Sequence, residues 1–171
     1  MRIAVVVIAI ATMIGVVAAV TPSDEGKTSP AFEKLKSLAG TWKARDNDGK
    51  SFAVSYKVVS AGTAVMETMD MHEHEASMIT MYHADGDKLM LTHYCSMGNQ
   101  PRMRAQGLSK DDSSLEFAFV DISNLINPAD AYMSGLVIRF KDADHFSEQW
   151  TMHKKGTEDH AETFEYERVK D

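Results

Sequence analysis

The sequence predicts an all-β domain, in which an antiparallel meander closes into a barrel of about 8–10 strands with a short N-terminal helix. Beyond residue 40, apolar residues recur with a period of two, as they do on half-buried strands. Turns rich in Gly, Asn and Asp separate these alternating segments. No long helical segment lies between them, which argues against a parallel sheet. Closing the meander removes its exposed edges.

The N-terminus is an apolar run, residues 3–20, which follows the basic residue Arg2. It ends in Val17-Ala18-Ala19, a small-residue site of the kind at which signal peptides are cleaved. We therefore expect an exported protein, periplasmic or secreted. The alternative is a membrane anchor formed by residues 3–20, whose length approaches that of a spanning helix. The chain then divides into a signal peptide (1–19), a polar linker (20–30) and a folded domain (31–171).

A short helix is expected first in the folded domain. Ser29 can cap it, and Pro30 suits its first position. Phe32 and Leu35 share its apolar face, and Gly40 ends it. Ten strand segments follow, at 41–46, 51–60, 63–71, 76–83, 88–96, 102–107, 114–121, 132–140, 145–153 and 161–169.

The alternation predicts which side chains face the barrel interior. Most inward positions are apolar, and Val58 and Phe119 are among them. Polar side chains interrupt these faces at Tyr56, His93, Glu148, Tyr166 and Arg168. Such interruptions favour a cavity with a few orienting groups over a completely filled barrel. Residues 123–131 form the expected loop across the mouth.

The formal net charge of -7 does not favour nucleic acid or anionic lipid as a partner. Membrane association is expected only if the N-terminal segment stays uncleaved. Cys95 is the single cysteine, so no internal disulfide can form, and we expect it to be buried as a small apolar residue. The sequence does not indicate an oligomeric state.

The segment from Leu89 to Met103 is the expected wall and rim of a ligand pocket, because varied polar groups interrupt an apolar strand there. We expect His93 to meet Tyr56 and Glu148 inside the barrel and to hydrogen-bond Glu67, Glu148 or a tyrosine. Near the turn, polar side chains either bind a ligand's polar end or hydrogen-bond the loop backbone. The candidate ligand-binding residues are His93, Cys95, Tyr56, Glu148, Glu67, Asn99, Gln100 and Arg102.

Neither a metal site nor a catalytic site is predicted. His93 and Cys95 could together bind a metal or haem iron, yet a structural zinc site needs about four ligands. His72 and His74 could hold zinc or copper, although their hydrophilic surroundings favour a solvated turn. A nucleophilic Cys–His pair would have parallel side chains and no orienting third group. Methionines crowd the middle strands and suit core filling or an apolar ligand: Met66, Met69, Met71, Met78, Met81 and Met90.

The segment from Leu35 to Trp42 resembles the opening of the calycins, the superfamily of lipocalins and fatty-acid-binding proteins. There, a short helix leads into a G-x-W motif on the first strand. The resemblance implies that Arg168, near the end of the last strand, packs on Trp42 as a structural cation–π pair. Residues 60–68, 78–83, 92–95 and 98–103 are similar to a bacterial lipocalin-like family of unknown function.

This likeness spans roughly residues 32–169 and implies a fold without an assigned chemistry. We therefore expect an exported lipocalin-like barrel that binds a small, partly apolar molecule, without a cofactor and more in keeping with a binding protein than an enzyme. Three alternatives stay open. The strand number also resembles the ten-stranded haem-binding barrels of the nitrobindin type. An enzyme could act on a small substrate through His93 and Glu148, and a ligand-free structural domain is the third alternative.

Overall fold

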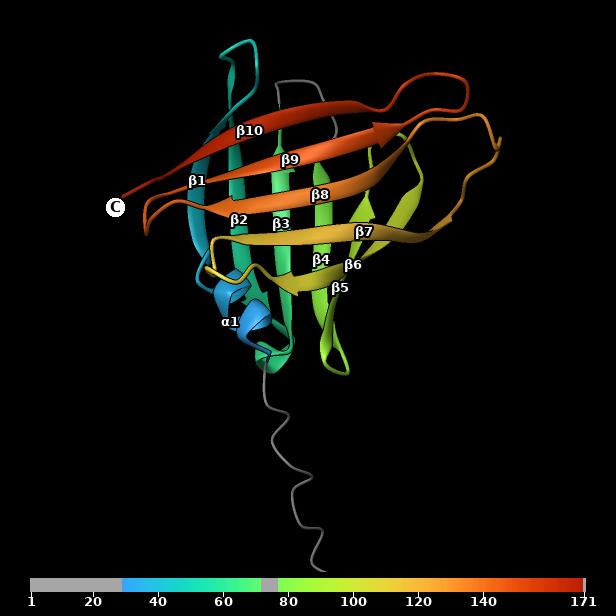
Figure 1. Cartoon of the computed structure of the whole chain (residues 1–171). Helices are drawn as coiled ribbons and strands as arrows, with labels where there is room; N and C mark the ends of the chain where they lie inside the picture. Colours follow the sequence, from blue (N-terminus) through green and yellow to red (C-terminus); the bar gives the residue numbers. More distant parts are fainter. Residues whose placement is uncertain (1–28, 72–76, 171) are drawn as a thin grey trace, which may run out of the picture.

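The structure is a computed structural model that describes residues 29–71 and 77–170, and it confirms the all-β fold class (Figure 1). Ten antiparallel strands follow one another around a closed barrel, and β1 pairs with β10. The strand ends differ from the expected ones by two residues at most. The elements are α1 (Pro30–Lys36), β1 (Gly40–Arg45), β2 (Ser51–Val59), η1 (Ser60–Gly62), β3 (Ala64–Asp70), β4 (Met78–Asp85), β5 (Lys88–Tyr94), β6 (Gln100–Leu108), β7 (Ser114–Ser123), β8 (Tyr132–Phe140), β9 (His145–His153) and β10 (His160–Arg168).

Some expectations lie outside the described residues. These are the signal peptide, most of the linker, and the pair His72 and His74. Among the described residues, no helix has the length and apolar character needed to cross a membrane.

The helix α1 covers one end of the barrel, near η1 (Figure 1). The Ser29 side chain caps it by accepting a hydrogen bond from the Phe32 backbone N–H at 3.2 Å, and Pro30 occupies the first turn as expected. Phe32 and Leu35 are buried in the barrel core. The helix therefore seals this end with its apolar face.

Trp42 and Arg168 close the barrel beside α1, in the arrangement that the G-x-W resemblance implies. They are register partners on β1 and β10, and the Arg168 guanidinium lies 4.0 Å from the Trp42 ring centroid. Arg168 also donates to the backbone carbonyls of Ser37, Ala39 and Ala143, at 2.9–3.1 Å. Gly40 has a φ of +139°, and a Cβ there would lie 2.7 Å from Arg168 Nη1. The glycine is therefore needed for the guanidinium to reach the indole.

Replacing Arg168 with alanine should lower the free energy of unfolding by about 1–3 kcal/mol, since it removes the cation–π contact and three charge-assisted hydrogen bonds. Arg168→Lys is the matched control and should recover part of this loss, because it keeps the charge without the planar donor geometry. Urea unfolding of both variants measures the effect. An alanine variant as stable as the wild type would show that the pair does not secure the barrel.

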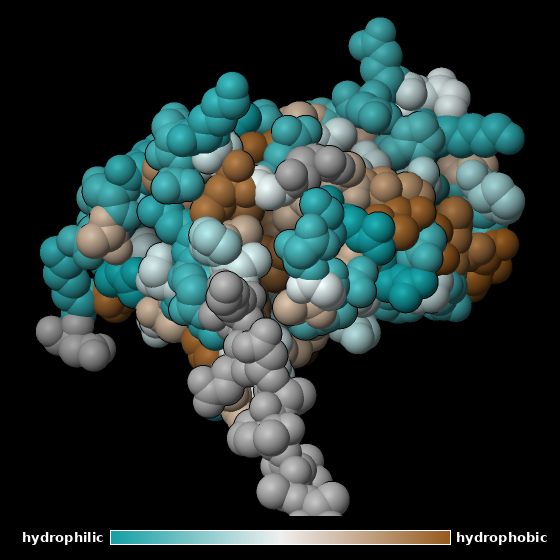
Figure 2. Space-filling model, turned by 60° about the horizontal axis from the view of Figure 1, so that its bottom comes forward, coloured by the Kyte–Doolittle hydropathy of each residue, from teal (hydrophilic) through white to brown (hydrophobic). Residues whose placement is uncertain are grey.

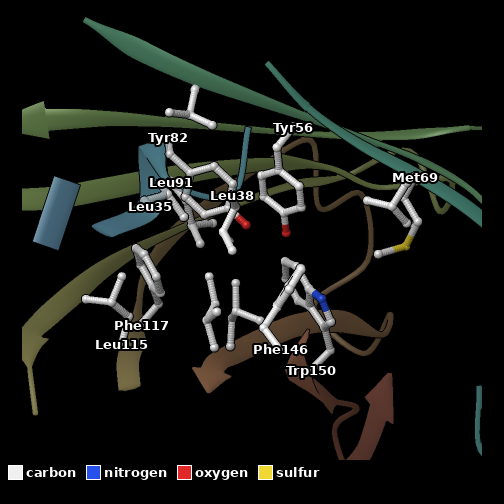
Figure 3. Packing of buried hydrophobic residues seen from close by; sticks show 14 of the residues in the cluster. Leu35, Leu38, Tyr56, Met69, Tyr82, Leu91, Leu115, Phe117, Phe146 and Trp150 are labelled. Atoms are coloured by element: carbon white, nitrogen blue, oxygen red, sulfur yellow. The ribbon is translucent and has the colours of Figure 1, made fainter. Parts of the chain in front are cut away.

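Aromatic side chains fill the half of the interior next to α1 (Figure 3). The Phe146 ring stacks on Tyr166 at 4.2 Å and meets Trp42 edge-on at 4.6 Å. Tyr82 packs against Phe117 at 5.8 Å. This half of the barrel is a packed core, so any ligand space must lie toward the opposite end.

Two residues expected to face inward are partly exposed instead: Val58 and Phe119, at 37% each. Phe119 is the register partner of the buried Met103, so it stays on the inward face of β7. A β-bulge follows it, because Arg102 pairs with Asp121 and leaves Val120 as one extra residue in β7. That β-bulge changes the alternation of the residues after Phe119. Phe119 itself packs on Tyr132, with the ring centroids 5.1 Å apart. Val58 lies one residue before the end of β2, at the rim beside η1.

The molecular surface is not uniformly polar. Figure 2 shows hydrophilic residues over much of the viewed face and hydrophobic side chains gathered along one side. The large exposed hydrophobic residues include Met97, Val120 and Ile126, of which Ile126 is 88% exposed. A groove between residues 97–99 and 124–131 contains Met97 and Ile126.

Candidate functional site

A methionine-lined pocket of about 110 Å³ opens between β3, β4, β5, β8, β9 and β10. It lies at the end of β3 away from η1 and α1 (Figure 1). Its wall is almost entirely apolar, which favours an apolar occupant. The lining residues are Met69, Met71, Met78, His93, Met133, Trp150, Met152, His160, Glu162 and Phe164.

Below the pocket, four polar side chains form a row across the inner wall. Tyr56, Glu67, Thr80 and His93 are consecutive register partners on β2, β3, β4 and β5, and all are buried. Register partners in an antiparallel sheet point to the same face. The row therefore continues across four strands, although its members are far apart in the sequence.

Glu148 on β9 accepts hydrogen bonds from three buried donors. Tyr56 donates to one carboxylate oxygen. Tyr166 and the Trp150 indole N–H donate to the other, at 2.9 and 3.0 Å. Burial raises the pKa of Glu148, and these hydrogen bonds oppose the rise. Both oxygens are thus occupied by protein donors.

Glu67 is the second buried carboxyl group, and Tyr82 donates to its Oε2 at 2.8 Å. Burial raises the pKa of Glu67 well above its usual value, and the charge of Glu148 raises it further. Its Oε1 has no hydrogen-bond partner among the described residues. The charge of Glu148 therefore disfavours the ionisation of Glu67.

Replacing Glu67 with glutamine should flatten the dependence of stability on pH. The folded-state pKa of Glu67 lies above its unfolded value of about 4.5, so its contribution to stability is present below that pH and is lost as pH rises through the folded pKa. Each unit of the rise corresponds to about 1.4 kcal/mol. Glutamine keeps an acceptor for Tyr82 and does not titrate. Unfolding measured across this pH range should show a variant that gains on the wild type as pH rises, and parallel curves would contradict this.

His93 is the member of this polar row that reaches the pocket. Its Nδ1 lies 3.0 Å from the Thr80 hydroxyl, and its ring lies 4.7 Å from Trp150. Its Nε2 is buried and has no hydrogen-bond partner among the described residues. Burial lowers the pKa of His93 to about 4, so the imidazole is neutral near pH 7. A neutral ring with one unused nitrogen thus faces an apolar space.

The expected meeting of His93, Tyr56 and Glu148 is only partly present. Tyr56 bonds Glu148 directly, whereas His93 contacts Thr80 and is joined to Glu148 through Trp150. The expected hydrogen bond from His93 to a carboxylate or a tyrosine is therefore wrong. Of the eight candidate ligand-binding residues, only His93 lines the pocket.

The candidates near the β5–β6 turn do not line the pocket. Cys95 is buried near the β5–β6 turn, where burial raises the pKa of its thiol. Asn99 donates to the Ala131 carbonyl at 3.0 Å, and Gln100 donates to the Gly98 carbonyl at 3.0 Å. Arg102 pairs with Asp121 on the exposed surface at 2.6 Å. These contacts occupy the Asn99 amide N–H, the Gln100 side chain and the Arg102 guanidinium, whereas Asn99 Oδ1 is buried without a hydrogen-bond partner among the described residues.

Sequence reasoning missed Thr80, Trp150 and the pocket side of β10. Trp150 and Met152 share one face of β9, and Glu162 and Phe164 share one face of β10. Their alternation was visible, but an inward position alone does not say whether a side chain lines a cavity or fills the core.

Comparisons with known proteins support the fold. No family model and no curated protein matches the chain. The crystal structure of Rv2717c from M. tuberculosis is similar at 18% identity and a TM-score of 0.54, over 83% of this chain and 99% of that chain. A redesigned β-barrel, b11L5F_LGL, matches at 8% identity and a TM-score of 0.41, over 84% of this chain and all of that one. The first likeness agrees with the closed antiparallel barrel, and at this identity it concerns the fold alone.

Proposed function

We propose that this barrel binds a small, uncharged and largely apolar molecule in the methionine-lined pocket, with His93 Nε2 as its polar anchor. The observation that carries the proposal is the unpartnered Nε2 in an apolar wall. A buried polar atom left without a hydrogen bond costs about 1–3 kcal/mol, and a ligand hydroxyl would recover much of that cost.

The size of the pocket limits the ligand to about one ring. Its volume of about 110 Å³ is comparable to that of an apolar cavity of roughly 150 Å³ that binds benzene. Methionine side chains are flexible and can widen such a space modestly. A long acyl chain would need a larger opening.

The charges near the pocket favour a neutral ligand. His93 is uncharged near pH 7, and no lysine or arginine is among the buried residues of the described chain. Glu162 lines the pocket, and the whole chain carries a formal charge of -7. A carboxylate would therefore be repelled, whereas an alcohol or a phenol would not.

Binding fits these contacts better than catalysis does. His93 and Glu148 do not contact each other, and three protein donors already occupy both oxygens of Glu148. A general base must reach the proton that it removes. His93 and Glu148 are not arranged as a pair of catalytic groups that act on the same substrate. A binding role requires only the free Nε2.

Haem is the second group to consider, because the free His93 Nε2 could serve as an axial ligand. The pocket in this structure is too small for haem. Its volume of about 110 Å³ is well below the roughly 300–1,000 Å³ of pockets for drug-sized ligands. The packed aromatic half of the barrel offers no further room.

The proposal is tested by titrating the protein with phenol-sized probes. Replacing His93 with leucine gives an apolar side chain of similar size that cannot form a hydrogen bond. This variant should bind phenol about threefold to tenfold more weakly, which corresponds to the loss of one hydrogen bond. Isothermal titration calorimetry measures the change, and a hydroxyl-free arene should bind both proteins alike. Gln100→Leu is the matched control and should bind as the wild type does. Equal phenol affinity in wild type and His93→Leu would show that His93 Nε2 does not hold the ligand.

Export remains part of the proposal. It is supported by the apolar segment 3–20 and the small residues Val17, Ala18 and Ala19. The N-terminal sequence of the mature protein tests this proposal, since cleavage after Ala19 leaves Val20 first. An intact Met1 or Arg2 in the membrane fraction would favour the anchor.

A further inference from the structure

We infer that the methionine-lined pocket also binds one soft monovalent metal ion, Cu(I), through the thioethers of Met69, Met71 and Met78 and the Nε2 of His93. Thioether sulfur and imidazole nitrogen are the ligand types that suit this ion. The inference goes beyond the proposed function and does not depend on it. The two occupants share a pocket, so each should exclude the other.

The strand register brings these donors to neighbouring levels of the barrel. Met69 and Met78 are direct partners across β3 and β4, so their side chains leave the sheet side by side. Met71 lies just after the end of β3 and lines the same pocket as Met69. The next level toward α1 contains Glu67, Thr80 and His93, again as register partners. Adjacent levels are about 7 Å apart, a separation that methionine side chains can bridge.

His93 provides the independent observation that a ligand belongs here. It is 2% exposed, it lines the pocket, and its Nε2 has no hydrogen-bond partner among the described residues. The Thr80 hydroxyl lies 3.0 Å from the other ring nitrogen. A hydrogen bond at that nitrogen fixes the ring, and when Nδ1 donates it, Nε2 presents its lone pair to the pocket.

The surroundings suit a single positive charge. The Trp150 ring lies 4.7 Å from the His93 ring, and Figure 3 shows Trp150 and Met69 on facing sides of the interior. An indole face attracts a cation. Glu162 also lines the pocket and supplies a negative charge.

Harder cations are not favoured. Zinc takes Cys, His and carboxylate ligands, and calcium and magnesium take oxygen ligands. Among the described residues, no group of three or more His, Cys, Asp or Glu side chains is placed to hold a metal ion. The thioethers therefore select the soft ion.

The test is an anaerobic titration of the purified protein with Cu(I), in competition with a chromophoric Cu(I) chelator. We expect one Cu(I) per chain and a change in tryptophan fluorescence. Met69→Leu with Met78→Leu should weaken the affinity at least about tenfold, as the loss of metal-site groups does. Met103→Leu, a buried methionine outside the pocket, is the matched control and should bind as the wild type does.

His72 and His74 lie outside the described residues, and a variant with both changed to asparagine should retain Cu(I). A wild type that does not compete with the chelator would overturn the inference. So would a Met69→Leu, Met78→Leu variant that binds as tightly as Met103→Leu, or binding that depends on His72 and His74 alone. Phenol binding to the metal-free wild type is measured separately, so the failure of one proposal is distinguishable from that of the other.

Discussion

Replacing Glu148 with leucine should lower the free energy of unfolding by about 3–5 kcal/mol, because three buried donors lose their acceptor at once. These are the hydroxyls of Tyr56 and Tyr166 and the indole N–H of Trp150. Glu148 is 0% exposed, so water cannot replace it without opening the barrel. Leucine fills a similar volume, and the loss is therefore one of hydrogen bonds rather than of packing.

Glu148→Gln is the matched control for this variant. It keeps one acceptor oxygen but places an amide N–H₂ among donors, so we expect an intermediate loss of about 1–3 kcal/mol. Guanidinium unfolding followed by circular dichroism measures both variants. A leucine variant that lost less stability than the glutamine variant would show that the carboxyl group is not the centre of this network.

Replacing Trp42 with alanine should cost about 3–5 kcal/mol, as truncation of a buried aromatic residue does. Trp42 is 1% exposed, meets Phe146 edge-on, and donates its indole N–H to the Leu38 carbonyl at 2.8 Å. Alanine also removes the surface on which Arg168 lies. The helix α1 and the closing strand pair would lose their shared contact.

Trp42→Phe separates the ring from the hydrogen bond and should cost about 1–2 kcal/mol. Chemical denaturation monitored by Trp150 fluorescence measures this variant, since the sequence has only two tryptophans. The same variant makes Trp150 the single reporter of pocket binding. An alanine variant within about 1 kcal/mol of the wild type would contradict the role of Trp42 in closing the barrel.

The strands could be predicted because their signals are local. Alternation of apolar residues and the glycine and aspartate turns define each strand within a few residues of sequence. The G-x-W resemblance likewise pointed to Trp42 and Arg168, although not to the reason for the glycine. Gly40 has a positive φ, and a Cβ there would crowd the Arg168 guanidinium.

The pocket could not be predicted in the same way because it depends on the level of each residue in the barrel. Tyr56, Glu67, Thr80 and His93 come together only through the pairing of four strands. A single extra residue in β7, Val120, shifts the alternation in the rest of that strand. The alternation in the sequence correctly predicted that Tyr56 and Glu148 point into the barrel. It did not show that they lie outside the pocket lining.

The most direct test of the binding proposal is native mass spectrometry of the protein purified from its own host. We expect the folded chain to carry one small, uncharged organic molecule, and His93→Leu to retain less of it. A folded wild type that shows only the mass of the bare chain, both as purified and after incubation with phenol-sized probes, would contradict the proposal and favour a ligand-free structural barrel.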